Sequence, residues 1–242
     1  MSSSVNFSMR HLLALLVLGF ALPAAAQQSE YLIVSGGPAL RKWEDLRRNG
    51  EQHDRFWGNF IRPARARIEE LQKAQPGIAI TWLVYKDSYE RRSVEDKRSV
   101  TALVESVRDK FKVKLVWIHT GDDVINYINS GSNRWRTKIS GFEYFGHSNK
   151  YCFMFDYSSD VYGASTSWLH QRDLKRIHSG AFAPNAYCKS WGCHTGEAMS
   201  AVWKKATGLW IIGANGKTDY TDLQLHNNLP HIGDGARWVT RG

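Results

Sequence analysis

The chain alternates short runs of β-branched and aromatic residues with segments in which apolar residues recur every three or four positions. The first pattern is typical of strands, and the second is typical of helices that pack one face on a sheet. Six runs are expected to be strands: Tyr31–Ser35, Ile78–Tyr85, Val113–Ile118, Phe142–Phe145, Ala186–Trp191 and Leu209–Ala214. This alternation predicts an α/β fold, a three-layer sandwich around a mostly parallel six-stranded sheet.

The helical periodicity falls between these strands. One amphipathic segment runs from Phe56 to Leu71, and Pro63 within it predicts a kink or a new helix start. Further helices are expected at Val100–Phe111, at Asp122–Ile128, weakly at Gln171–His178, and at Thr195–Thr207 with Gly208 as its stop. Tyr151–Tyr157 reads as a short strand or hairpin arm. The tail from Asn215 shows little periodicity.

The first residues have the pattern of an export signal. A short basic start at Arg10 is followed by the apolar run Leu12–Leu22 and by the small residues Ala24–Ala26. The apolar run is shorter than the roughly 20 residues of a membrane-spanning helix. We therefore predict a signal peptide over residues 1–26 and a single domain over residues 27–242. The mature protein is expected in the periplasm or outside the cell, without stable membrane insertion.

The net charge of +9 does not by itself indicate a polyanion site. Basic residues are scattered among acidic ones, as in the stretch RRSVEDKR, which favours a solvated basic surface over a dedicated binding face. An exported protein also does not meet the nucleic acid of its own cell. No nucleic-acid partner is therefore expected, and the oligomeric state stays open.

Two strand-like runs end at bends that carry a reactive side chain. The stretch Phe142–Asn149 carries Gly146 and His147 just past its strand, and the stretch Asn185–Thr195 carries Gly192 and Cys193. Functional groups of parallel sheets gather at the carboxyl ends of the strands. His147 and Cys193 are therefore expected at one edge, where an imidazole can activate sulfur as a nucleophile.

The surrounding backbone suits this chemistry. The expected helix start after Cys193 would favour a thiolate through its free N–H groups and dipole. The N–H groups near Gly146 and Gly192 are candidate donors to an oxyanion, and these glycines allow close approach of a substrate. The plainer alternatives are a loop histidine with satisfied hydrogen bonds and a small buried cysteine at a helix start.

Other residues offer weaker candidates. His194 is a rival base, but neighbouring residues on a bend point apart, so His147 is preferred. His226 and His231 have no cysteine or carboxylate at ligand spacing, so neither a metal nor another cofactor is expected. An odd count of three cysteines leaves at least one unpaired. Cys152 and Cys188 could form a disulfide that leaves Cys193 free, or all three could be reduced.

The order of a strand ending in Gly-His, a strand ending in Gly-Cys-x-Thr-Gly about 45 residues later, a helix, and a strand ending in Gly-Ala resembles the caspase-like cysteine peptidases of the caspase–hemoglobinase group. The resemblance covers residues 142 to about 220. It implies that His147 is the catalytic histidine and Cys193 the nucleophile, with Gly146 and the N–H of Cys193 near the oxyanion site. It also implies a specificity pocket formed by loops after the sheet. The candidate acidic residues that would select Lys or Arg are Asp156, Asp160 and the segment Asn215–Asp222, which contains Asp219.

Two positions depart from the pattern of that group. Ser148 follows the histidine where the group usually has glycine, and Gly192 precedes the cysteine where alanine is often found. The sequence thus predicts an exported cysteine endopeptidase that transfers the acyl group of a peptide or protein substrate to water, without a cofactor. A caspase-like binding or scaffold module without activity is one alternative, motivated by Ser148.

A third reading is an L,D-transpeptidase of the bacterial envelope. The stretch SWGCHTG looks like the Ser-His-Gly-Cys motif of that family. Trp191 stands where the motif has histidine, and His147 is far away in the chain. That family has an all-β fold, so the expected α/β pattern argues against it.

Overall fold

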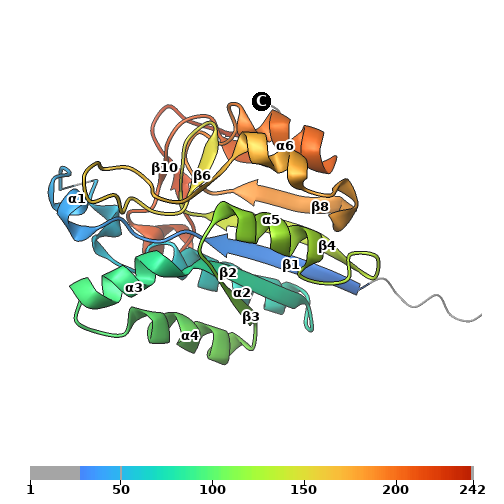
Figure 1. Cartoon of the computed structure of the whole chain (residues 1–242), viewed down its shortest axis with the longest axis horizontal. Helices are drawn as coiled ribbons and strands as arrows, with labels where there is room; N and C mark the ends of the chain where they lie inside the picture. The colour runs from blue at the N-terminus through green and yellow to red at the C-terminus, as the bar shows by residue number, and fades with distance from the viewer. Residues whose placement is uncertain (1–27, 50, 241–242) are drawn as a thin grey trace, which may run out of the picture.

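A five-stranded parallel sheet forms the centre of the molecule (Figure 1). The computed structural model describes residues 28–49 and 51–240. The strands lie in the order β3-β2-β1-β4-β8. Their bounds are β1 Gln28–Ser35, β2 Ala79–Tyr85, β3 Lys114–Ile118, β4 Thr137–Phe145 and β8 Phe182–Ser190. All four strand pairings are parallel, which confirms the expected α/β class.

The prediction of a sixth strand in this sheet was wrong. Within Leu209–Ala214, only Ile212 reaches the sheet, through an isolated parallel bridge to Lys189. The next two residues, β9 (Gly213–Ala214), pair antiparallel with β12 (Trp238–Val239). Beyond Ile212, the carbonyl of Ala214 accepts the N–H of Gly196 over 2.9 Å, so the turn after Cys193 takes a bond that a longer sixth strand would have given to β8.

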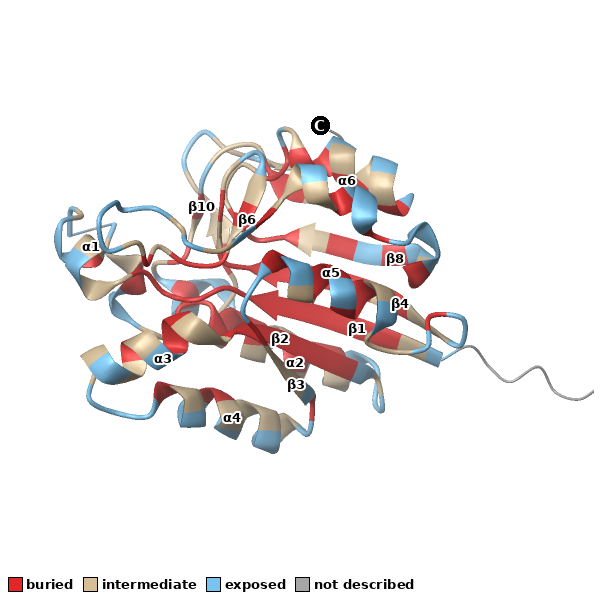
Figure 2. Cartoon of the chain, in the orientation of Figure 1, coloured by how far each residue is buried: buried red, intermediate tan, exposed pale blue. Residues whose placement is uncertain are grey.

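Helices cover both faces of the sheet because successive strand residues point to opposite sides. Leu32 and Val34 of β1 pack in the cluster that contains α5 (Gly121–Ser130) and α6 (Met199–Thr207). Tyr31 and Ile33 pack in the other cluster, with the helices α2 (Ile61–Ala74), α3 (Lys86–Glu95) and α4 (Val100–Phe111). Figure 2 shows the resulting pattern, with β1 buried almost throughout and the helices buried only in part.

The helices α2, α4, α5 and α6 overlap expected helical segments, whereas the expected helix at Gln171–His178 is the 3₁₀ segment Gln171–Arg176. The segment of α3 was not expected, because it holds few apolar residues, and the buried Tyr89 and Arg92 fix it instead. Pro63 is the third residue of α2, which accords with a helix start just before it. Thr120 is the N-cap of α5, and its side chain accepts the N–H of Asp123. Gly208 ends α6 in the left-handed conformation, as expected.

Short elements gather at the carboxyl ends of the strands. In Figure 1 the arrowheads of β1 and β8 point to the end of the molecule where α1, β6 and β10 lie. The remaining elements are α1 (Arg41–Asp45), η1 (His53–Arg55), β5 (His147–Ser148), β6 (Cys152–Met154), β7 (Trp168–His170), η2 (Gln171–Arg176), η3 (Ser179–Ala181), β10 (Thr218–Asp219), η4 (Leu223–His226) and β11 (His231–Ile232). The strands among them form two small antiparallel sheets, β5-β6-β7 and β10-β11.

The expected signal peptide, residues 1–26, lies outside the described residues. Among the helices that the structure describes, none has the length and apolar character needed to cross a membrane.

Candidate active site

The two bends singled out in the sequence meet at one edge of the sheet. His147 follows β4 and Cys193 follows β8, and these strands are neighbours. The hydroxyl of Ser148 donates to the carbonyl of Cys193 over 2.6 Å. The N–H of Trp191 donates to the carbonyl of Tyr144 over 2.8 Å. Segments about 45 residues apart in the chain are thus joined directly beside both reactive side chains.

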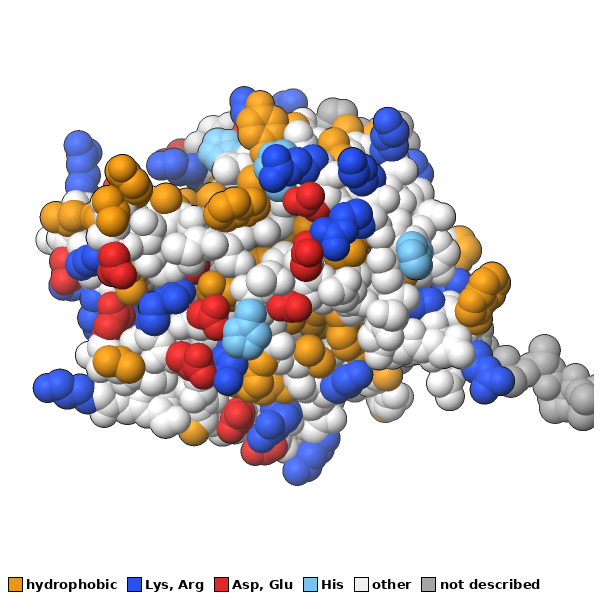
Figure 3. All heavy atoms as spheres, viewed as in Figure 1, with side chains coloured by type: hydrophobic (Ala, Val, Ile, Leu, Met, Phe, Trp, Pro, Cys, Tyr) orange, Lys and Arg blue, Asp and Glu red, His pale blue; other side chains and the backbone are white. Residues whose placement is uncertain are grey.

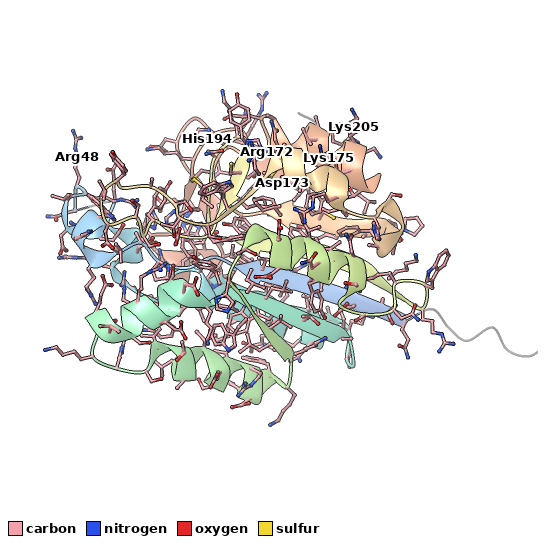
Figure 4. All side chains as sticks on the ribbon, viewed as in Figure 1. Arg48, Arg172, Asp173, Lys175, His194 and Lys205 are labelled. Carbon is pink, nitrogen blue, oxygen red and sulfur yellow. The ribbon has the colours of Figure 1, made fainter. Side chains whose placement is uncertain are left out.

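His147 and Cys193 line the same pocket, which has a volume of about 610 Å³. Its wall also includes Arg47 and His53 from the segment before α2, Tyr157, and residues of the β10–β11 region such as Thr218. The rival base His194 lines the same pocket, and Figure 4 shows it in the upper part of the molecule. The face of the molecule seen in Figure 3 carries basic side chains scattered among acidic and hydrophobic ones.

The sulfur of Cys193 is held by a strand rather than by a helix end. The helix α6 begins only at Met199, so the expectation of a helix N-terminus at the sulfur was wrong. The reason is the tight turn after Cys193, in which His194 takes a left-handed φ of 61°. The N–H of Thr218 instead donates to Sγ of Cys193 over 3.4 Å.

His147 is fixed by a carboxylate that the sequence did not reveal. Its Nε2 lies 2.5 Å from Oδ2 of Asp54, which is fully buried and also accepts the N–H of Ala39 over 2.9 Å. The rings of Tyr157 and Phe60 pack edge-on against His147 at centroid distances of 4.5 and 4.9 Å. The side chain of His147 is only 10% exposed.

This hydrogen bond determines the tautomer of His147. A carboxylate can only accept, so Nε2 carries the proton and Nδ1 keeps its lone pair. Burial is the main influence on the pKa of His147 and lowers it, although Asp54 opposes this. Burial alone would raise the pKa of Asp54, but the imidazoles of His147 and His53 hold it well below its usual value. His147 is therefore a neutral base beside a carboxylate that stays ionised.

The two candidate bases, His147 and His194, differ in their hydrogen-bond partners and in their exposure. His194 Nδ1 lies 2.5 Å from Oε1 of Glu197, and its side chain is 39% exposed. His147 is buried against aromatic rings and has a fixed orientation. His147 is therefore the more constrained of the two, and the preference for it as the base stays a prediction.

Most of the N–H groups expected to stabilise an oxyanion already donate to another acceptor. The N–H of Gly146 donates to the hydroxyl of Tyr220 and that of Gly192 to the hydroxyl of Ser190, each over 3.2 Å. The N–H of His194 donates to a carbonyl over 2.7 Å. Within the described part of the chain, the N–H of Cys193 has no acceptor. Gly146 and Gly192 were therefore wrong as N–H donors, because neighbouring hydroxyls occupy both.

The two departures from the caspase-like pattern compensate each other. A Cβ placed on Gly192 would lie 2.1 Å from Oγ and 2.8 Å from Cβ of Ser148. Distances below about 3 Å do not occur between such atoms, so the side chain of Ser148 fills the space that an alanine at 192 would need. Ser148 and Gly192 are therefore complementary in packing.

Gly192→Ala is expected to destabilise the protein by about 1–3 kcal/mol, because the new methyl group displaces Ser148 and breaks its hydrogen bond to Cys193. Thermal unfolding measures the loss. The double variant Ser148→Gly, Gly192→Ala should recover part of the stability lost in Gly192→Ala, since the glycine removes the two nearest atoms and leaves the carbonyl oxygen of Gly146 at 3.0 Å. Equal losses in the single and double variants would contradict the complementarity.

The three carboxylates suggested for substrate selection have different positions. Asp156 is fully buried and pairs with Arg91 over 2.9 Å, and Asp160 is 88% exposed beside Lys42; neither lines the pocket. These two assignments were wrong, because Asp156 pairs with Arg91 of α3 and Asp160 with Lys42 of α1, and from the loop after β6 it is Tyr157 that lines the pocket. Asp219 does line the pocket, with its Oδ1 accepting the N–H of Thr221 over 2.6 Å.

All three cysteines are free thiols, and the suggested Cys152–Cys188 disulfide is not formed. Cys188 points into the core beside α6, where burial raises its pKa to about 12. Cys152 lies in the separate small sheet β5-β6-β7, and burial also raises the pKa of its thiol. Cys193 is the only one of the three that lines the pocket of His147.

Metal ligands are not grouped in the part of the chain that the structure describes. No three His, Cys, Asp or Glu side chains there are arranged to hold a metal ion. The rings of His226 and His231 stack on each other at a centroid distance of 4.0 Å.

Comparison of the chain with protein-family models, with curated proteins and with solved structures finds no significant match in any of the three.

Proposed function

We propose that the protein is a cysteine peptidase in which Cys193 is the nucleophile and His147 carries protons. The observation that supports this best is the shared pocket at the ends of neighbouring strands, with His147 anchored on Asp54. This combination of a thiol, an oriented imidazole and a carboxylate is a general arrangement for acyl transfer.

The proposed reaction has two steps. In the first, Nδ1 of His147 takes the thiol proton as Sγ of Cys193 bonds to the carbonyl carbon of the substrate. The resulting oxyanion faces the free N–H of Cys193. When the C–N bond breaks, the leaving amine takes the proton from His147. In the second step, water gives a proton to His147 and its oxygen attacks the thioester carbon. The C–S bond then breaks, the acid leaves, and Sγ of Cys193 takes the proton back from His147.

Asp54 supports both steps without changing its own protonation. It holds Nε2–H of His147, so Nδ1 points its lone pair away from the carboxylate. Its negative charge stabilises the imidazolium that forms in each step. The N–H of Thr218, directed at Sγ of Cys193, is a donor available to negative charge on the sulfur.

A caspase-like arrangement is the reading we favour among the alternatives. The parallel sheet does not match the all-β fold implied by the transpeptidase resemblance. The motive for an inactive binding module was Ser148, but the missing side chain of Gly192 accommodates it. Peptide or protein is the substrate class that the resemblance implies, and export through residues 1–26 remains part of the proposal.

Reactivity of the thiol separates an enzyme from a binding module. We expect a small uncharged alkylating probe to label Cys193 at least about tenfold faster than Cys152 or Cys188, because only Cys193 has an oriented base in its pocket. Mass spectrometry after timed labelling gives the three rates. His147→Ala should remove the advantage of Cys193. A Cys193 that reacts no faster than Cys152 would support the binding module instead.

A further inference from the structure

His53 is hydrogen-bonded to the second oxygen of Asp54, the carboxylate that holds His147. Nδ1 of His53 lies 2.8 Å from Oδ1 of Asp54, while Nε2 of His147 lies 2.5 Å from Oδ2. The two imidazole centroids are 5.5 Å apart, and both rings line the pocket of Cys193. One fully buried carboxylate thus bridges two imidazoles.

We propose that His53 is a positioning residue of this site, which competes with His147 for the charge of Asp54 and so limits how strongly His147 holds a proton. Its catalytic consequence rests on the proposed function. The coupling between the two rings does not, because it follows from their shared carboxylate alone.

The acidic groups around His53 favour its protonated form. Besides Asp54, the buried carboxylate of Glu44 in α1 faces this cluster and accepts the N–H of Asp54 over 2.9 Å. Burial lowers the pKa of His53, but Asp54 and Glu44 outweigh it and leave the pKa raised. The side chain of His53 is 24% exposed, so it exchanges protons with solvent.

The other charged or titratable neighbours of His53 influence its protonation less strongly. Nη1 of Arg47 lies 3.4 Å from Nε2 of His53 and opposes a proton there, although Arg47 is itself 3.0 Å from Glu44. Asp219 of β10 favours a charged His53, whose positive charge in turn helps to lower the pKa of Asp219. The ring of Tyr220 lies 6.4 Å away between centroids.

A proton on His53 makes a second proton on His147 less favourable. Burial lowers the pKa of His147 most, Asp54 raises it, and the charges of His53 and Arg47 lower it again. His53 therefore helps to keep His147 in the neutral form that accepts the proton of Cys193. Removing the charge of His53 should let Asp54 stabilise the imidazolium of His147 more fully.

The test removes the charge of His53 but keeps its hydrogen bond to Asp54. His53→Asn offers a side-chain N–H to Oδ1 of Asp54 and cannot be protonated. The pKa of His147, followed by NMR of its ring Cε1–H and assigned with His147→Ala, should rise by about one pH unit. The pH dependence of Cys193 alkylation by iodoacetamide should move in the same direction.

His119→Asn is the matched control, because His119 also pairs through Nδ1 with an aspartate, Asp87 at 2.6 Å, but does not line the pocket. It should leave the pKa of His147 unchanged. His53→Gln is measured in parallel, so that the misfolding of one variant does not decide the result. An unmoved pKa of His147 in a folded His53 variant overturns the inference. A shift in a protein that cleaves no peptide supports the inference and counts against the proposed function alone.

Discussion

Cys193→Ala is expected to reduce peptide hydrolysis by the mature protein by at least about 10⁴-fold, because the only thiol in the pocket of His147 is then lost. The substrate is found first, by screening the wild-type protein against a library of peptides with varied residues on both sides of the scissile bond. Cleavage of the best substrate by each variant is then followed by mass spectrometry.

Cys152→Ala is the matched control for this loss. Cys152 is a free, partly buried thiol like Cys193, but it lies outside the pocket. Its removal should leave the rate of cleavage within about twofold, since surface changes away from a site have small effects. Cleavage that persists at the wild-type rate in Cys193→Ala would remove Cys193 as the nucleophile, and with it the proposed reaction.

The main strands, and the position of His147 and Cys193 on one edge of the sheet, could be predicted from the sequence because they depend on the pattern of apolar runs. Apolar runs mark the strands, and parallel strands bring their carboxyl ends to one edge. The pairing of β4 with β8 then places both bends together without further information. The prediction of a sixth strand was wrong because the segment leaves the sheet after Ile212 for contacts with Gly196 and β12, which no local pattern marks.

Asp54 and His53 could not be found in the same way. They lie in a one-turn 3₁₀-helix within a polar stretch between β1 and α2, and no spacing connects that stretch with β4. The adjacent pair His53-Asp54 was the only available signal. Their position depends on long-range contacts, such as the N–H of Ala39 and the guanidinium of Arg92, which donates to the carbonyl of Asp54 over 3.0 Å.

Asp54→Asn is expected to reduce peptide hydrolysis by about 10²–10⁴-fold while leaving the sulfur and the pocket in place. An asparagine amide can direct its N–H₂ at Nε2 of His147, and that nitrogen must then accept. The proton moves to Nδ1, the atom that the proposed reaction needs as a base. The loss should therefore be in kcat, and the NMR signals of the neutral ring should report a proton on Nδ1 instead of Nε2.

Asp156→Asn separates this effect from a general loss of stability. Asp156 is as fully buried as Asp54 and pairs with Arg91, but it is absent from the pocket. Both variants should lower the thermal unfolding temperature, because each weakens a buried charge–hydrogen-bond network. Only Asp54→Asn should change the tautomer of His147. If the two variants lose activity equally in proportion to their stability, Asp54 has a structural role only, and the site acts through Cys193 and His147 alone.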